Sequence, residues 1–362
     1  MRICLIGNNL TNYVLANVLA KKEIIVDILG NTKLYKNDSL RTLAISNSNF
    51  NYMRKAIKNL NIPSWPSKKI KIYGEKSGQK ELFVFENKDK NTFNLIKYKE
   101  IFNFFYNYSK KNKKINFIKT NNKKINLNID KRKYNLIINS DSESNLTKKY
   151  FYKNFQKDYH SVAYTSVIKH KKILNNFAIQ IFSINGPIAF LPLSAHETSV
   201  VFSYNGKKKI NEGNVIKIIK KYNSKYQILD FGKFEKFNIK FFMLRKYYYK
   251  NVLSFGDLIH RIHPLAGQGF NMTIRDIKIL SKIIDEKNNL GLEINSEVAG
   301  EFEKKTKHLN YLYGSSVDFI YEFFKIDNKI KNLISKPIFN ILNKNKLLNK
   351  FATRFSDVGL EI

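Results

Sequence analysis

The residue types best suited to chemistry gather in one short run, GDLIHRIHPLAGQGFNMTIRD, which starts at Gly256. Asp257 follows a short apolar stretch, and at the carboxyl end of a strand its carboxylate can accept hydrogen bonds from ligand hydroxyls. Pro264 fixes a turn, after which Gly267 and Gly269 expose backbone N–H groups where a helix begins. A helix N-terminus stabilises an anion, and glycine lets a flat ligand approach the backbone closely. The run therefore predicts a site for a flat ligand that carries or gains negative charge.

Other side chains of the run allow more than one interpretation. Asn271 adds an amide donor and acceptor to the expected site, whereas Arg275 and Asp276 lie one turn further on and are expected to orient the helix. His260 and His263 have the i, i+3 spacing of a metal pair, but no matching cluster of Asp, Glu or Cys accompanies them. We therefore favour a structural role for both histidines beside the loop and expect no metal ion.

The elements that must position these residues alternate from the start of the chain. Arg2–Ile6 is expected to form a strand, Leu10–Lys21 a helix with one apolar face, and Ile24–Leu29 a second strand. This is a βαβ opening, and it places Gly7 at the first turn. Further strands are expected at Arg41–Ile45, Ile70–Tyr73, Glu81–Phe85, Tyr134–Ile138 and Val252–Phe255, and further helices at about Phe50–Leu60, Tyr98–Tyr108 and Phe270–Ile284.

Two later regions of the chain have different sequence patterns. Alternating segments between Tyr159 and about Leu244 predict an antiparallel sheet. From Glu297 onward the chain is expected to be helical, with a loop or kink near Pro337. Tyr247–Tyr249 are expected to cover a sheet edge or a domain seam rather than to stack on bases.

The chain has 362 residues with a net charge of +35, and 43% of them are hydrophobic, enough for a large core. Such a charge makes nucleic acid or an anionic membrane surface a natural partner. However, the lysine excess accompanies abundant Asn, Ile, Tyr and Phe, whose codons are A/T-rich, so a low-GC genome explains it better. The lysines are scattered apart from short runs such as Lys207–Lys209, and no helix-turn-helix, RRM or zinc-finger pattern is present. We therefore expect no nucleic-acid partner.

Cys4, the single cysteine, lies in an apolar run and is expected in a buried strand, without a disulfide. The first apolar run ends at Gly7, unlike a signal peptide, and no apolar run reaches the ~18 residues that span a bilayer. A cytoplasmic location is expected, with attachment to a membrane surface still allowed.

The run that starts at Gly256 resembles the second FAD motif of the flavin-dependent aromatic hydroxylases, and more narrowly the ubiquinone-biosynthesis hydroxylases among them. Arg41–Ser46 resembles the arginine segment of that family, Asn185–Leu193 its G-P-x-A-x-L-P-L strand, and Phe302–Lys305 with the following helices its C-terminal part. The resemblance implies an α/β (α+β) fold: a Rossmann-like FAD-binding domain, an antiparallel β-sheet substrate domain and C-terminal helices. The implied boundaries are 1–65, 90–158 and 245–290 for the FAD-binding domain, 66–89 and 159–244 for the substrate domain, and 291–362 for the helical region.

The resemblance also implies a ligand and its contacts. Asp257 would bind the ribityl chain of FAD, and the Pro264–Asn271 loop would hold the edge of the isoalloxazine ring. The implied cofactor-binding residues are Gly7, Arg41, Asp257, Pro264, Ala266, Gly267, Gln268, Gly269, Phe270 and Asn271, among which Pro264, Gly267, Gln268 and Gly269 position the flavin. Arg41 either lines the flavin cleft or pairs with a surface acid. No catalytic acid or base is named, because the cofactor carries the chemistry.

The nucleotide half of the implied site departs from the family pattern. Where the family has G-x-G-x-x-G for the pyrophosphate, this chain reads Gly-Asn-Asn-Leu-Thr-Asn from Gly7 to Asn12. Gly30 stands where an acid for the adenosine ribose is expected, and Asp141 alone remains of a G-A-D-G segment, in an Asn/Ser loop that usually means an Asx-turn. Restoring glycine at Asn9 and Asn12 is expected to tighten FAD binding if their side chains crowd the pyrophosphate.

Three functions are compatible with these patterns. The first is an FAD-dependent monooxygenase that uses NAD(P)H and molecular oxygen to hydroxylate the aromatic ring of a polyprenylated ubiquinone precursor. The second is a catalytically weak or inactive accessory subunit of a ubiquinone-biosynthesis complex, which the altered Gly7 loop favours. The third is a nucleic-acid binder, which rests on charge alone.

Apolar residues recur at helical spacing near the C-terminus, with lysines between them. They are Phe319, Ile320, Phe323, Phe324, Ile330, Leu333, Ile334, Ile338, Ile341 and Leu342, with Lys325, Lys329, Lys331 and Lys336. Two interpretations carry equal weight: these helices pack on the flavin domain, or they dock on an anionic bilayer as a peripheral contact at the inner membrane surface. A polyprenyl substrate in the bilayer would favour docking.

Overall fold

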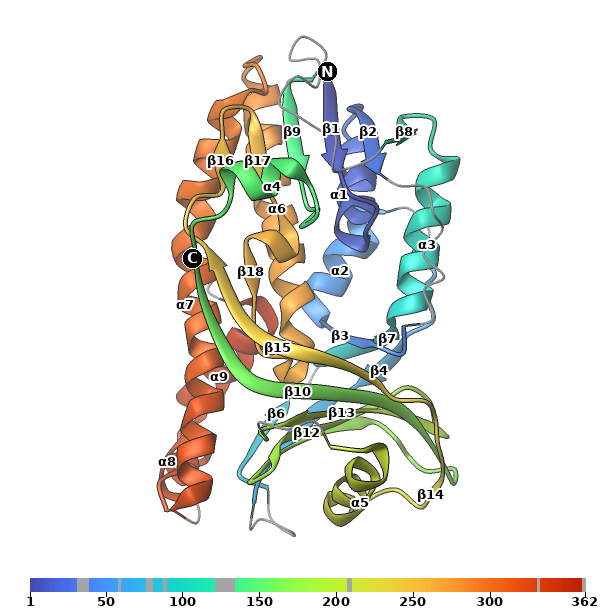
Figure 1. Ribbon diagram of the computed structural model, residues 1–362, viewed down its shortest axis with the longest axis vertical. Helices are drawn as coiled ribbons and strands as arrows, with labels where there is room; N and C mark the ends of the chain where they lie inside the picture. The colour runs from blue at the N-terminus through green and yellow to red at the C-terminus, as the bar shows by residue number, and fades with distance from the viewer. Residues whose placement is uncertain are drawn as a thin grey trace.

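The computed structural model describes residues 1–30, 39–57, 60–75, 81–86, 90–120, 134–206, 210–330 and 333–359. Its strands form three sheets, and a long C-terminal helix runs beside them (Figure 1). The mixed α/β fold class predicted from the sequence is confirmed. The Lys207–Lys209 run and Lys331 lie outside the described residues.

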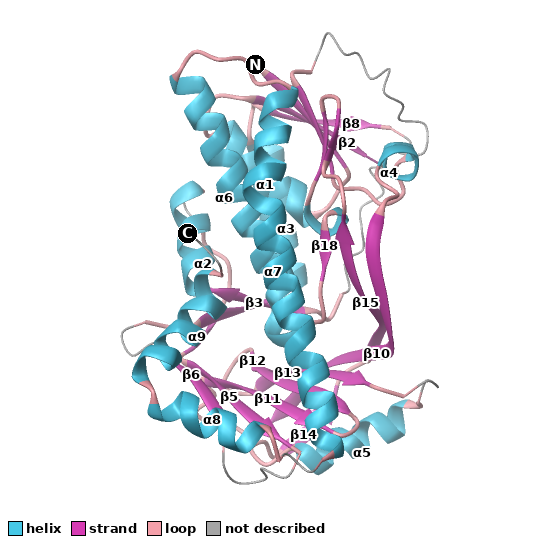
Figure 2. Cartoon of the chain, turned by 90° about the vertical axis from the view of Figure 1, so that its left-hand side faces the viewer, coloured by secondary structure: helices cyan, strands magenta, loops and turns pink. Residues whose placement is uncertain are grey.

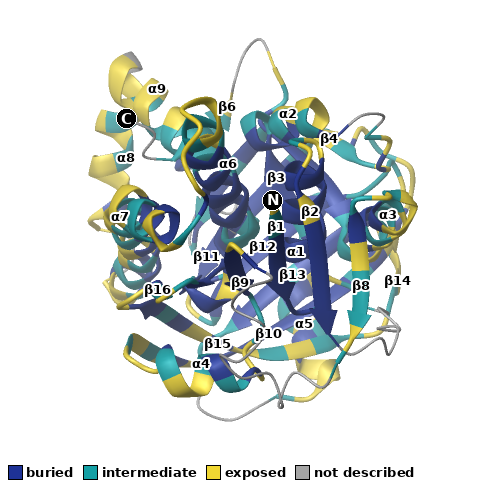
Figure 3. Cartoon of the chain, turned by 90° about the horizontal axis from the view of Figure 1, so that it is seen from above, coloured by how far each residue is buried: buried dark blue, intermediate teal, exposed yellow. Residues whose placement is uncertain are grey.

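A six-stranded sheet in the order β16-β17-β9-β1-β2-β8 includes the start of the chain. Its strands are β1 (Arg2–Ile6), β2 (Ile25–Gly30), β8 (Ile115–Lys119), β9 (Leu136–Asn139), β16 (Tyr248–Tyr249) and β17 (Val252–Ser254). All neighbouring pairs are parallel except β16–β17 at the edge. The central strands are buried along almost their whole length (dark blue in Figure 3), which is why they read as continuous apolar runs.

Helix α1 (Leu10–Ala20) is buried all round, not only on its expected apolar face. It packs between α3 (Tyr98–Lys111) and α6 (Gln268–Asn289), as well as on the sheet. Its polar residues therefore need partners inside the protein, and Asn17 finds one in the Ser109 hydroxyl at 2.7 Å.

The predicted antiparallel sheet is present as a nine-stranded sheet in the order β18-β15-β10-β13-β12-β11-β5-β6, with β14 also paired to β10. Its strands are β5 (Lys69–Gly74), β6 (Phe83–Glu86), β10 (Asn154–His170), β11 (Phe177–Ser183), β12 (Gly186–Pro192), β13 (Glu197–Tyr204), β14 (Ile228–Phe231), β15 (Glu235–Leu244) and β18 (His260–Arg261). Only β11–β5 is a parallel pair. Helix α5 (Glu212–Tyr222) buries Val215 and Ile219 against one face of this sheet.

A small third sheet joins the two larger ones. Strand β3 (Thr42–Ser46) was expected, but it pairs with β7 (Phe93–Lys97), which in turn pairs with β4 (Trp65–Ser67), and neither of these was predicted. Both short strands include Lys, Asn or Pro among their apolar residues, so neither shows the clear alternation of apolar and polar residues that predicts a strand. Helix α2 (Asn47–Ala56) follows β3 directly, and the short α4 (Asn145–Tyr150) follows β9.

The C-terminal part is helical, as expected, in α7 (Ser296–Lys329), α8 (Ser335–Lys344) and α9 (Lys346–Val358) (Figure 2). The break lies before α8 rather than at Pro337, because a proline is tolerated in the first turn, where its missing N–H has no helical partner. No helix in the described part of the chain is both long and apolar enough to cross a membrane.

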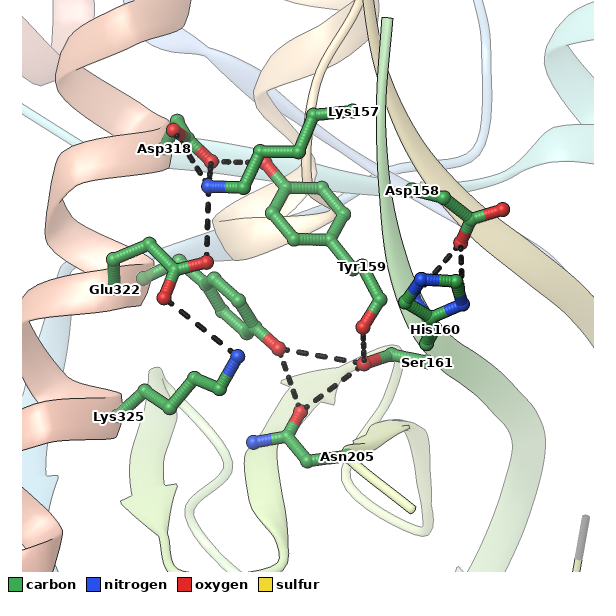
Figure 4. A network of polar contacts seen from close by, with 10 residues as sticks. Lys157, Asp158, Tyr159, His160, Ser161, Asn205, Asp318, Glu322 and Lys325 are labelled. Atoms are coloured by element: carbon green, nitrogen blue, oxygen red, sulfur yellow. Dashed lines mark hydrogen bonds and ion pairs between the residues drawn. The ribbon is translucent and has the colours of Figure 1, made fainter. Parts of the chain in front are cut away.

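Helix α7 is fixed to strand β10 by a polar network (Figure 4). The Tyr159 hydroxyl donates to Asp318 at 2.6 Å, and the Lys157 ammonium bonds the same carboxylate at 3.0 Å. One turn along α7, the Tyr321 hydroxyl donates to Asn205 at 2.7 Å. Because α7 also contacts β16 and β17 of the six-stranded sheet, it bridges the two large sheets. The domain boundaries expected from the sequence stay a prediction.

Candidate functional site

The 264–271 loop forms the start of α6, as the sequence predicted. It contains a 3-10 turn, η3 (Leu265–Gly267), and Gly267 caps α6 with φ of 66°, a left-handed conformation that favours glycine. Strand β3 approaches so closely that a Cβ at Gly267 would lie 3.0 Å from the Ala44 nitrogen. At Gly269 an added Cβ would meet no atom within 4 Å. The helix N-terminus is therefore open on the Gly269 side, which is the cradle that a flat ring needs.

The side chains of this loop mostly hold it in place. The Asn271 amide donates to Ala44 O at 2.8 Å and its oxygen accepts from the Ser46 N–H at 2.9 Å, so Asn271 ties α6 to β3 instead of facing a ligand. Gln268 accepts from the Tyr313 hydroxyl at 2.7 Å. Pro264 and Phe270 are half-buried, and the side chain of Ala266 lies outside the described part of the structure.

Asp257 lies at the carboxyl end of β17, in the 3-10 turn η2 (Gly256–Leu258), with its side chain exposed. Gly256 has φ of 63° and packs against Thr11 of α1, because a Cβ there would be 2.9 Å from the Thr11 Cγ2. Asp257 therefore stands beside the Gly7 turn, at the edge where the carboxyl ends of β17, β9 and β1 meet. The structure brings together two segments about 250 residues apart in the sequence, as expected for a ligand at this edge.

The Gly7 turn joins β1 to α1, and asparagine side chains fill it. Gly7 has φ of 113°, and its N–H donates to Leu29 O at 2.8 Å. Asn9 caps α1 by accepting from the Asn12 N–H at 3.0 Å, and it donates to the Ser140 hydroxyl at 2.8 Å. One of the helix N–H groups that a phosphate would use is thus already satisfied.

Two more asparagines close the same turn. The Asn12 amide is buried and donates to Ile6 O at 3.0 Å and to Gly7 O at 2.7 Å. The Asn8 carboxamide lies over Gly30, where an added Cβ would be 2.9 Å from it. Asp141 accepts from the Glu143 N–H at 2.8 Å, which confirms the expected Asx-turn. Thus the residues present fit the ring and ribityl half of FAD, whereas the adenosine-diphosphate half does not fit the turn as it stands.

His260 and His263 are both buried among other side chains of the protein. His260 Nε2 lies 2.7 Å from an Asp276 carboxylate oxygen, both residues are buried, and Asn310 donates to the other oxygen at 3.1 Å. His263 packs against the rings of Tyr159 and Tyr321, with centroids at 5.3 and 4.3 Å, and the two tyrosine rings also contact each other. Burial lowers the pKa of His263 to about 3, so its ring is neutral at pH 7. In the described part of the chain no three or more His, Cys, Asp or Glu residues cluster as metal ligands.

Arg41 and the tyrosine run contact aromatic rings. The Arg41 guanidinium is 4.7 Å from the Phe237 ring centre, so it stacks where β3 meets the large sheet. Tyr248 and Tyr249 form the edge strand β16, with Tyr249 stacked on Tyr150 at 4.3 Å. The tyrosines therefore cover a sheet edge, as expected.

A cavity of about 510 Å³ lies beside the 264–271 loop. Its walls come from the large sheet, Leu265 and Gln268 of the loop, and α7, α8 and α9 (the elements gather at the lower part of Figure 2). Apart from Gln180, Gln268, Ser316, Ser356 and the hydroxyl of Tyr313, its lining is apolar. Such a volume is sufficient for a drug-sized organic ligand.

Sequence comparisons agree with this geometry. The sequence model of the family described as FAD binding domain matches residues 146–288, which include Asp257 and the 264–271 loop. The mitochondrial ubiquinone biosynthesis monooxygenase COQ6 of Dictyostelium discoideum is 35% identical over 74 residues, 20% of this chain and 15% of that protein. The ubiquinone hydroxylase UbiL of Rhodospirillum rubrum is 21% identical over 179 residues, 47% of this chain and 41% of that protein. The matches therefore span less than half the length of these curated relatives.

The fold is matched over nearly its whole length. The crystal structure of p-nitrophenol 4-monooxygenase from Pseudomonas putida superimposes with a TM-score of 0.79, covering 99% of this chain and 98% of that one at 11% identity. The chain has the fold of the flavin-dependent aromatic hydroxylases. The resemblance stated from the sequence is confirmed.

Within this hydroxylase fold, some sequence-predicted site residues come together and others do not. Asp257 lies beside the Gly7 turn at one sheet edge, whereas Gly269 lies at the start of α6, next to the close contact of Gly267 with β3, and Arg41 and Asn271 make contacts of their own. Of the polar residues that line the cavity, the sequence predicted Gln268 as a site residue but not Gln180. A single glutamine inside the apolar strand Phe177–Ser183 was the one signal available for it.

Proposed function

We propose that this chain is an FAD-dependent monooxygenase that hydroxylates the aromatic ring of a prenylated ubiquinone precursor. The observation that supports this best is the open start of α6 at Gly269 beside a largely apolar cavity of about 510 Å³. A flat redox ring and an apolar aromatic substrate would be neighbours there. The similarity of short segments to ubiquinone-pathway monooxygenases supports the substrate class.

The protein's own residues have limited tasks in this reaction. Bound FAD, reduced by NAD(P)H, would supply the oxygen chemistry. The N–H groups and dipole at the start of α6 would stabilise negative charge on the ring, and Gly269 leaves room for it. The exposed Asp257 carboxylate would accept hydrogen bonds from the ribityl hydroxyls. The apolar cavity would keep water from the reacting ring.

The amide-filled turn favours a second candidate function. For the pyrophosphate to reach α1, the Asn9 amide must leave the Ser140 hydroxyl, and the Asn8 carboxamide must leave Gly30. FAD would therefore bind more weakly than to a glycine loop. If the turn never opens, the chain is a catalytically inactive subunit of a biosynthetic complex that keeps the hydroxylase fold.

We also propose a peripheral contact with the inner membrane surface. Exposed apolar side chains follow the end of α7 and the next two helices: Phe319, Ile326, Leu333, Ile341, Leu347 and Phe351. Exposed lysines lie between them, at 329, 336, 344 and 350. Apolar burial together with attraction to anionic lipid supports docking of such a face. Phe324 takes no part in it, because it is buried and stacks on Phe182 at 3.8 Å.

The visible spectrum of the purified chain tests the cofactor proposal. We expect flavin bands after reconstitution with FAD, and Asp257→Ala is expected to weaken FAD binding about 10- to 100-fold through the loss of charge-assisted hydrogen bonds. Asp230→Ala removes an equally exposed carboxylate on β14 and serves as the matched control. A chain that cannot be reconstituted at any FAD concentration would favour the inactive-subunit function, and undiminished binding in Asp257→Ala would place the flavin elsewhere.

A further inference from the structure

The cavity beside the 264–271 loop has a polar inner end at Gln180. This residue lies on β11 and also borders a small gap lined by Ala44 and Ile70, and Ala44 in turn packs against Gly267. Gln180 is buried, and its amide donates to Ile188 O at 3.3 Å. Its carbonyl oxygen has no hydrogen-bond partner among the described residues. Because Gln180 lines the cavity, a ligand donor inside the cavity can meet this oxygen.

The other end of the cavity reaches the surface between two C-terminal helices. Phe319 and Ile320 of α7 and Phe351 of α9 line the cavity and are also exposed. The mouth is therefore apolar, and it belongs to the same face that carries the exposed leucines and isoleucines of α8 and α9. A ligand that fills the cavity would meet the Gln180 acceptor inside and an apolar rim outside.

The charge of the lining restricts the ligand further. None of the described residues that line the cavity is Lys, Arg, His, Asp or Glu. An ionised head group would lose its hydration there without gaining a counter-charge, which is strongly unfavourable. A neutral hydroxyl loses much less, and it can donate to the Gln180 oxygen.

We infer that the cavity binds a neutral, single-tailed phenol with its hydroxyl at Gln180 and its apolar tail leaving between α7 and α9. The inference rests on the proposed function, since it names the form and the orientation of that substrate. Gln180 is then a specificity-determining residue, and Phe351 is part of the rim through which the tail passes. Carboxylated analogues with the same tail are excluded.

Calorimetry with the full-length chain, with and without added FAD, tests the ligand class. We expect 2-geranylphenol to bind at least about 100-fold more tightly than phenol, because the ten-carbon tail is buried. We expect 3-geranyl-4-hydroxybenzoate, which carries a carboxylate, to bind at least about tenfold more weakly than 2-geranylphenol. Equal affinity for the phenol and the carboxylate, or no gain from the tail, would overturn the inference.

The rim is tested with two variants of one helix. Phe351→Glu places a charge at the cavity mouth, whereas Leu347→Glu, one turn earlier on α9, changes an exposed residue that does not line the cavity. Affinity for 2-geranylphenol is expected to fall at least about tenfold in the first variant and less than about twofold in the second. Equal losses in both variants would show that the tail does not pass between α7 and α9.

The orientation is tested at Gln180. In the parent chain 2-geranylphenol is expected to bind about tenfold more tightly than geranylbenzene, and Gln180→Met, which has a similar volume, should abolish that preference. A preference that persists in the folded variant would place the hydroxyl elsewhere. If Gln180→Met does not fold, the orientation is tested on the parent chain by photo-crosslinking with a geranylphenol that carries a diazirine at the end of its tail. Labelling of residues 314–358 supports the orientation, and labelling of β11 overturns it.

The inference and the proposed function fail in different ways. A chain that binds 2-geranylphenol as described but never retains flavin would refute the monooxygenase and leave the ligand site standing. A flavin-loaded enzyme that hydroxylates phenols lacking a tail, with no gain from a geranyl group, would support the reaction type and refute the cavity inference.

Discussion

At the scale of single residues, two asparagine side chains hold the Gly7 turn, and only Asn9 takes up a helix N–H that a bound pyrophosphate would use. Asn9 accepts from a helix N–H and bridges to Ser140, and Asn12 joins two backbone carbonyls of the turn. The two residues are not equivalent. Asn9 is a cap that glycine replaces at small cost, whereas Asn12 lies inside a buried helix and satisfies Ile6 O and Gly7 O.

This difference revises the expectation that glycine at both positions tightens FAD binding. We predict that Asn9→Gly tightens FAD binding about five- to tenfold, since an amide hydrogen bond of about 1 kcal/mol no longer has to break. Asn12→Gly should instead lower the free energy of unfolding by about 2 kcal/mol, because the Gly7 oxygen loses this donor, the Ile6 oxygen keeps only its bonds from Ser140, and glycine weakens the helix. Fluorescence titration of FAD and urea unfolding measure the two effects. If Asn12→Gly tightened FAD binding and Asn9→Gly did not, the roles assigned to the two asparagines would be wrong.

His263 makes the stability of the fold depend on pH. Its folded pKa of about 3 lies below the ordinary value of 6.5, because burial disfavours the charged form of the ring. As the pH falls from 6.5 toward 3, only the unfolded chain takes up this proton, so stability is lost at about 1.4 kcal/mol per pH unit. Above pH 6.5 the contribution is constant.

The variant His263→Phe keeps an aromatic ring against Tyr159 and Tyr321 and removes the titration. Between pH 7.5 and pH 5 the parent chain is expected to lose about 2 kcal/mol more unfolding free energy than this variant. Urea unfolding at both pH values provides the comparison, and parallel losses would contradict the assignment.

At the scale of elements, helix α9 is held in place because a residue at its end caps the N-terminus of helix α2. Ser46, the N-cap residue of α2, makes no side-chain cap hydrogen bond. Asp357 at the end of α9 accepts from the Ser48 N–H at 2.9 Å instead, and its backbone oxygen accepts from the Ser46 hydroxyl at 2.8 Å. A carboxylate at a helix N-terminus also interacts favourably with the helix dipole. The wall of the cavity is thus fixed to the segment that follows β3.

We predict that Asp357→Ala weakens the docking of α9 by about 1 kcal/mol, the usual value of a helix cap. Trypsin cleavage after Lys350 and Arg354 should then be about fivefold faster, since cleavage requires local opening of the helix. Asp357→Asn keeps an acceptor oxygen and is the control. Identical cleavage rates in all three chains would mean that the apolar contacts of α9 alone hold it.

At the scale of the whole molecule, the long helix α7 links the two halves of the fold. Its network with β10 fixes it against one large sheet, and its contacts with α6 hold it against the other half (Figures 2 and 4). Its far end, with α8 and α9, carries the exposed apolar face. An enzyme arranged in this way would present its cavity mouth to the surface on which it docks.

We predict that the parent chain sediments with anionic vesicles at low salt, and that Leu333→Glu with Ile341→Glu reduces its partition at least about tenfold. Leu229→Glu with Leu290→Glu changes equally exposed residues on other elements and should leave binding within about twofold of the parent. A similar loss in both double variants would indicate non-specific attraction by the net charge, and no sedimentation of the folded parent would refute membrane docking.

The sequence alone determined the backbone of the candidate site and the class of the fold. Gly267 at φ of 66° and the helix that follows it are properties of a few adjacent residues, and so are the buried strands around Gly7. Conformation of this kind is encoded locally, because residue type restricts φ and ψ. The motif around Gly256 is therefore recognisable from the order of its residues.

Only the tertiary structure decided which partners the side chains meet. Asn271 was expected to face a ligand, yet it bonds Ala44 and Ser46, which are more than 200 positions away in the sequence. Gln180 becomes a cavity residue because β11 and the 264–271 loop line the same cavity, and Asp357 caps a helix near the start of the chain. Such contacts depend on the order of strands in the sheets and on the path of the last helices. No periodicity or spacing along the chain specifies that arrangement, so it follows only from how the apolar faces pack.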